Sequence, residues 1–264
     1  MERRFPHRAA RLSTLLCWVL CLAAAAALKI HYRHADSDGL LWILGPTSWL
    51  VETLLGIPLE YEPGAGYWGY EMGILIAPGC AGVNFLLIAF ASVVFPCTAA
   101  FRRSILKGAA LAAAAAGAYL TTLWANAFRI VVAAWLYAGG LSVGWMTPER
   151  IHRLEGVLVF VAALWLFSST VRRCLACLGG PAGADRNRVG AGGLRAPLAW
   201  YVLGVVVVPL ANPFRPGIDP AFFEHCATVL GGCAMAASAA WAAARIGPRG
   251  RRTRSEGEGM PCDL

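Results

Sequence analysis

The sequence predicts an all-α fold: a polytopic transmembrane helical bundle of about six spans, with additional re-entrant or interfacial helices. Of 264 residues, 58% are hydrophobic and only 14% are charged, which is typical of membrane proteins. The apolar residues form runs close to the roughly 20 helical residues that cross a hydrocarbon core. The basic residues gather in short groups beside those runs, which indicates membrane topology rather than nucleic-acid binding.

Six apolar runs are interpreted as crossings. The first follows an arginine-rich start, and its apolar part is long for a cleaved signal peptide, so we expect an uncleaved span. The six runs are residues 12–30, 82–100, 108 to about 126, 156–171, 197–211 and 227–244. Two other apolar stretches, residues 40–59 and 130–145, are each compatible with a span, a re-entrant hairpin or a helix on the membrane surface.

The basic groups decide between these readings through the positive-inside rule. Six crossings keep the N-terminus and every basic group in the cytoplasm, whereas counting either ambiguous stretch alone as a span exports the groups that follow it. Counting both as spans places the first basic group outside. The groups are Arg102, Arg103 and Lys107, then residues 172–195, then residues 245–254. We therefore expect both ambiguous stretches on the outer side.

The chain is expected to form one transmembrane domain over residues 1–246, followed by a disordered cytoplasmic tail, residues 247–264. A stretch rich in glycine and aromatic residues, 61–70, lies in the outer segment between the first two spans. We interpret it as an interfacial aromatic belt rather than a phosphate-binding loop.

Three reactive residues are predicted at one membrane face. Cys80 lies among small residues at the outer start of the second span, and His152 precedes the fourth. Arg129 lies about 22 residues beyond Lys107, which brings it to the outer boundary at roughly 1.5 Å per residue. A thiol nucleophile, an imidazole base and a fixed cation supply what acyl transfer requires. Taken singly, each also fits a plainer role as a packing cysteine, a snorkelling arginine or an incidental histidine.

Between about residues 73 and 156, the chain resembles the exosortase and archaeosortase family of membrane-embedded cysteine transpeptidases. Three segments carry the resemblance: Cys-Ala-Gly at 80–82, Asn-x-x-Arg at 126–129, and His-x-x-x-Gly at 152–156. Their order and spacing match the family pattern. The stretch 78–85 looks most like the exosortase K type.

The resemblance implies a bacterial inner-membrane enzyme whose active site lies at the periplasmic face, with a catalytic core of about residues 73–171. Such an enzyme cleaves a PEP-CTERM-like C-terminal signal, made of a Pro-containing motif, a transmembrane helix and a basic cluster. It then transfers the exported protein from a thioacyl-enzyme to an acceptor. By this resemblance, the expected nucleophile is Cys80 and the expected general base and acid is His152. Arg129 is expected to stabilise the oxyanion or thiolate, and Asn126 is a supporting residue. The expected partners are these membrane-anchored substrates and the lipid bilayer, with no nucleic acid, cofactor or metal.

The alternative is a non-catalytic polytopic protein, such as a transporter or an envelope or polysaccharide assembly factor. Against a transporter, the spans carry almost no midplane ionisable residues. Cys174 and Cys177 form a single Cys-x-x-Cys motif, without the further ligands that a zinc site needs. His225 and Cys226 are adjacent, so their side chains point in different directions on a helix. Glu155 could orient His152, although we expect a solvated carboxylate there.

Overall fold

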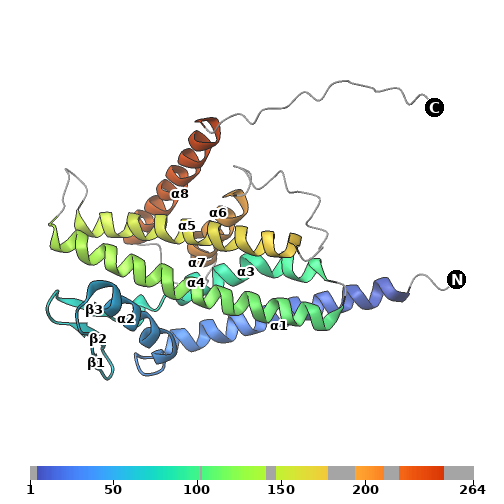
Figure 1. Ribbon diagram of the computed structural model, residues 1–264, viewed down its shortest axis with the longest axis horizontal. Coiled ribbons are helices and arrows are strands. Elements are labelled where there is room, and N and C mark those ends of the chain that lie inside the picture. The colour runs from blue at the N-terminus through green and yellow to red at the C-terminus, as the bar shows by residue number, and fades with distance from the viewer. Residues whose placement is uncertain (1–4, 102, 141–146, 178–193, 211–219, 247–264) are drawn as a thin grey trace, which may run out of the picture.

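The computed structural model describes residues 5–101, 103–140, 147–177, 194–210 and 220–246. Helices dominate this part of the chain, as the sequence predicts (Figure 1). The predicted tail, residues 247–264, lies outside the described residues. The helices are α1 (Phe5–His34), α2 (Leu41–Leu55), α3 (Val83–Ala100), α4 (Ser104–Ala138), α5 (Pro148–Cys177), α6 (Arg195–Val202), α7 (Val208–Leu210) and α8 (Pro220–Ile246).

Four stretches are helical, long and apolar enough to cross a membrane: residues 11–34 within α1, residues 78–100 ending in α3, and the whole of α4 and α5. None of the apolar window of α1 is buried, whereas half of that of α3 is. Large apolar side chains of α1, such as Leu20 and Leu22, are 66% and 73% exposed. Such a surface is unfavourable in water and favourable in lipid, which supports the membrane class.

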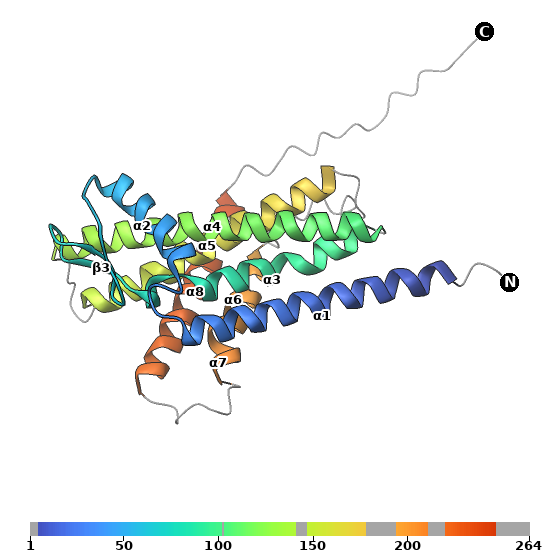
Figure 2. The ribbon, with the colours of Figure 1, turned by 90° about the horizontal axis from the view of Figure 1, so that it is seen from below.

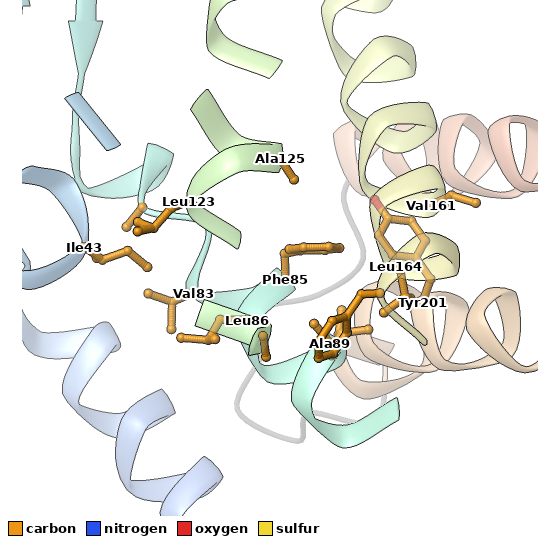
Figure 3. Close-up of a cluster of buried hydrophobic side chains, with 14 of the residues drawn as sticks. Ile43, Val83, Phe85, Leu86, Ala89, Leu123, Ala125, Val161, Leu164 and Tyr201 are labelled. Carbon is orange, nitrogen blue, oxygen red and sulfur yellow. The ribbon is translucent and has the colours of Figure 1, made fainter. Parts of the chain in front are cut away.

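The packed core lies where these helices meet α2 and α6 (Figure 3). Phe85 of α3 stacks on Phe160 of α5, with 4.5 Å between ring centroids. Tyr201 of α6 reaches the same cluster and is only 4% exposed. Helix α3 is thus the central element, with α4 and α5 beside it and α1 on its outer side (Figure 2).

Helix α4 is one continuous helix of 35 residues, roughly 52 Å long at 1.5 Å per residue. This corrects the prediction that the third span ends near Asn126 and that residues 130–145 form a separate element. No glycine or proline interrupts the chain from residue 118 to 138, so nothing ends the helix before Gly139 and Gly140, where Gly140 has a φ of +57°. Residues 141–146 of that stretch lie outside the described residues.

The other ambiguous stretch, residues 40–59, forms the short helix α2 of 15 residues, which packs on α4. The Tyr119 hydroxyl of α4 donates to the Trp42 carbonyl at 2.6 Å. Like residues 195–210, α2 is an apolar helix shorter than the four candidate spans.

A small antiparallel sheet, β1 (Glu60–Glu62), β2 (Gly66–Gly69) and β3 (Ile74–Ile76), follows α2 in the order β1-β2-β3. The sequence reading missed these strands, because aromatic residues near glycine also fit a membrane-interface belt. Gly64 and Gly66 adopt positive φ angles of 78° and 128° at the β1–β2 turn, where glycine is unstrained. The sheet and α2 sit together at the end of the bundle opposite the N-terminus (Figure 1).

The fifth and sixth predicted spans correspond to a short apolar segment and to α8. Residues 195–210 run through α6, a π-helical turn (Leu203–Val207) and α7, and are classed with the shorter apolar helices. Helix α8 packs against α5. In the part of the chain described, neither belongs to the four stretches that qualify as spans by length and composition.

The contact between α5 and α8 depends on a glycine. A Cβ atom placed on Gly232 would lie 2.7 Å from Val157 Cγ1, whereas one on the neighbouring Gly231 would meet nothing within 4 Å. We therefore expect Gly232→Leu to lower the unfolding midpoint of the detergent-solubilised protein by about 3 °C or more, because overpacking costs about 1–3 kcal/mol. Gly231→Leu is the matched control and should change it by less than about 1 °C. Equal midpoints would show that α8 does not pack on α5 through this face.

Candidate active site

Cys80 lies at the junction between the sheet and the central helix. After β3, Pro78–Cys80 form one 3-10 turn (η1), in which the Cys80 amide donates to the Ala77 carbonyl at 2.8 Å. Gly82 then precedes α3 with a φ of +71°, which favours glycine. A Cβ atom on Gly82 would lie 3.2 Å from the Thr122 methyl group. The glycine therefore allows α4 to approach the turn that carries the thiol.

Asn126 of α4 joins that turn to Arg129. Its side chain is fully buried, and its Nδ2 donates to the backbone carbonyl oxygen of Cys80. Its Oδ1 accepts a hydrogen bond from Arg129 Nη2 at 3.3 Å. Residues three apart lie on the same helix face, so one amide contacts both groups.

Arg129 faces the interior of the bundle. A Cβ atom on Gly156 of α5 would lie 3.2 Å from Arg129 Cδ, and the guanidinium carbon lies 5.5 Å from the centroid of the Phe160 ring. Arg129 Nε is buried without a hydrogen-bond partner. This setting differs from snorkelling, in which the charged head reaches the headgroups. A cation held in an apolar bundle end is costly unless it is paired, hydrated or functional.

His152 lies one helical turn before Gly156. Its Nδ1 is buried and lies 3.6 Å from Glu155 Oε2, and its ring is 6.1 Å from that of Tyr137. The Glu155 side chain is only 11% exposed, so the expectation of a solvated carboxylate is wrong. The packing of α5 against its neighbouring helices places this carboxylate inside the protein, which sequence spacing alone does not reveal.

The structure connects the three predicted segments, though not through direct contact of all the reactive atoms. Cys80, Asn126 and Arg129 form one hydrogen-bonded series, and Arg129 packs on α5 at Gly156. Within the described residues, no hydrogen bond joins the Cys80 sulfur to His152 or to Arg129. A reactant would therefore have to lie between these groups.

Two residues of α1 that the sequence reading did not select lie at the same place. Lys29 Nζ donates to Asn84 Oδ1, one turn beyond Cys80, and lies 5.4 Å from the centroid of the Tyr32 ring. Tyr32 is within electrostatic range of the Cys80 thiol. A lysine near the C-terminal end of an otherwise apolar helix was the available signal.

Other polar groups lie apart from this series. Cys174 and Cys177 are exposed at the far end of α5. His225 lies on α8, within electrostatic range of Arg153. Over the described ranges, no cluster of three or more His, Cys, Asp or Glu side chains is placed to hold a metal ion.

An open apolar groove of about 810 Å³ runs along α4 and α5. Its lining includes Ala125, Phe128, Leu158 and Ala162, none of which is ionisable. The groove therefore suits contact with hydrocarbon, and the reactive groups described above lie elsewhere.

Comparison with known proteins gives no match to a family model, a curated protein or a solved structure.

Replacement of Asn126 tests whether its side-chain amide holds the Cys80 turn and Arg129 in place. Asn126→Leu keeps the number and branching of the side-chain heavy atoms but leaves the Cys80 carbonyl and Arg129 without that partner, so we expect a loss of about 2–4 kcal/mol in stability. Thermal unfolding in detergent measures it. Asn84→Leu is the control, because Asn84 is exposed and accepts one hydrogen bond, from Lys29. Similar midpoints for the two variants would contradict a structural role for Asn126.

Proposed function

We propose that this chain is a membrane-embedded cysteine transpeptidase or endopeptidase of the exosortase kind. The observation that carries the proposal is the series from the Cys80 carbonyl through Asn126 to Arg129, packed against α5 at Gly156. It links the three short segments on which the resemblance rests, although they come from different helices.

In the proposed reaction, His152 accepts the proton of the Cys80 thiol as the sulfur attacks the carbonyl carbon of the scissile peptide bond. A carbon–sulfur bond forms, and the carbonyl oxygen becomes an oxyanion that the Arg129 guanidinium stabilises. Collapse of this intermediate breaks the carbon–nitrogen bond, and His152 returns the proton to the leaving amine. An acceptor amine or water, whose proton His152 takes, then attacks the thioester carbonyl; the carbon–sulfur bond breaks, and the Cys80 sulfur regains that proton.

The membrane supplies part of the substrate binding in this proposal. A substrate held by its own transmembrane helix is confined to the bilayer plane, so its scissile bond is presented near the site at high effective concentration. The proposed substrates are exported proteins with a C-terminal tripartite sorting signal. Such an enzyme needs no large soluble cleft.

The proposed topology places the active site at the periplasmic face of a bacterial inner membrane. It has six crossings, with α8 and the segment 195–210 as the last two. The positive-inside rule supports this arrangement, since it keeps Arg102, Arg103 and the later basic groups in the cytoplasm. If the last two segments did not cross the membrane, the first four crossings would keep the same orientation.

Loss of the thiol tests the proposal directly. Cys80→Ala should still insert but yield no processed substrate, because no other described residue replaces the nucleophile in this geometry. Candidate proteins with tripartite tails are co-expressed with each variant, and their C-termini are determined by mass spectrometry. The exposed Cys174→Ala is the control and should process normally. Normal processing by Cys80→Ala would refute the proposal.

The guanidinium is tested by a substitution that keeps its charge. Arg129→Lys should lower the processing rate by about 10²–10³-fold, because an ammonium does not reproduce the planar donor fork at the developing oxyanion. Initial rates of product formation in membranes measure the effect. Arg153→Lys, on α5 near Glu224, changes an exposed arginine in the same way and should leave the rate within about twofold. An unchanged rate in Arg129→Lys would mean that Arg129 supplies only charge or packing.

A further inference from the structure

The pairing of His152 with Glu155 is not explained by stability. Both carboxylate oxygens of Glu155 are buried and have no hydrogen-bond partner, and the side chain is 11% exposed. Among the described residues, the one basic nitrogen within 4 Å of this carboxylate is His152 Nδ1, at 3.6 Å. Burial of a carboxylate without hydrogen bonds is costly, so packing alone gives no reason for a glutamate here.

The two nitrogens of the imidazole are in different environments. Nδ1 is buried and faces Glu155, while the side chain as a whole is 30% exposed. Nε2 is therefore the nitrogen that can meet a reactant. A carboxylate beside Nδ1 favours the tautomer with its proton on Nδ1, and it stabilises the imidazolium that forms when Nε2 accepts a proton.

We propose that Glu155 is a positioning residue for His152: it holds the imidazole with Nε2 toward the reactant and stabilises its protonated form. This inference rests on the proposed function, in which His152 takes the proton of Cys80. Glu155 itself does not contact the reacting atoms.

Other titratable groups surround the pair. Arg129 and Tyr137 approach α5 from α4, and Tyr201 of α6 is within electrostatic range of Arg129. On the α8 side, Glu224 pairs with Arg150 and Arg153, and Arg153 also acts on His225. Because several charged groups lie near the pair, the test compares variants that differ by one carboxylate.

The experiment uses the full chain in detergent and follows alkylation of Cys80 by iodoacetamide from pH 5 to 9, with each cysteine resolved by peptide mass spectrometry. Glu155→Gln should raise the midpoint of the Cys80 reactivity profile by about half a pH unit or more, because less imidazolium stabilises the thiolate. Reactivity at pH 7 should fall about threefold, and the initial processing rate should fall with it. Glu149→Gln removes an exposed carboxylate from the first turn of the same helix and should leave the profile unchanged.

His152→Gln separates this inference from the proposed function. A shifted profile in His152→Gln with an unchanged one in Glu155→Gln overturns the inference and leaves the proposed function standing. An unchanged profile in His152→Gln counts against the proposed function, and the inference falls with it. The double variant His152→Gln, Glu155→Gln should have the same Cys80 midpoint as His152→Gln alone. A further shift of that midpoint would mean that Glu155 acts on the thiol directly and would overturn the inference.

Glu155→Asp covers the case in which Glu155→Gln does not accumulate. Aspartate draws the carboxylate back toward the backbone, so it should shift the midpoint in the same direction by a smaller amount. A midpoint equal to that of the wild type in every Glu155 variant that folds would overturn the inference.

Discussion

The geometry of this protein's candidate site depends on one buried amide. The carbonyl of Cys80 lies in a 3-10 turn rather than in the body of a helix, and Asn126 of α4 supplies its side-chain hydrogen bond. The same amide accepts from Arg129, so both of its polar atoms are satisfied. In a low-dielectric interior such bonds are strong and costly to lose. The amide therefore sets the relative positions of α4 and the start of α3, which Gly82 allows to approach closely.

The distribution of charge follows from this packing. Arg129, His152 and Glu155 lie at the same end of α4 and α5, and each has a buried polar atom without a hydrogen-bond partner. At the other end, Lys107 is 2% exposed and donates to Ser13 and Thr14 of α1 at 3.0 and 2.7 Å. The apolar middle separates the two sets, as expected where charge is unfavourable in hydrocarbon.

Much of the helical fold could be predicted from the sequence, because the length of the apolar runs and the basic clusters beside them reflect the membrane directly. Hydropathy found the four long helices, and short motifs selected Cys80, Arg129 and His152. The uninterrupted course of α4 was missed because Arg129 looked like the end of a span, although no glycine or proline follows it before Gly139. Lys29 and Glu155 could not be assigned, since their roles depend on how α1 and α5 rotate against their neighbours. That rotation is set by tertiary packing, which periodicity does not encode.

The length of α4 also changes where the candidate site lies. The helix continues from Arg129 to Ala138, which is roughly 13 Å of further helix at 1.5 Å per residue. The candidate site is therefore set back from the C-terminal end of α4, at the end of the bundle where α2 and the small sheet lie (Figure 1). Arg129 Nε is buried, so in the proposed reaction the guanidinium would act on a developing oxyanion more strongly than at an exposed rim. Under the proposed function, the same position would restrict access for soluble peptides and suit a substrate that is held in the bilayer by its own helix.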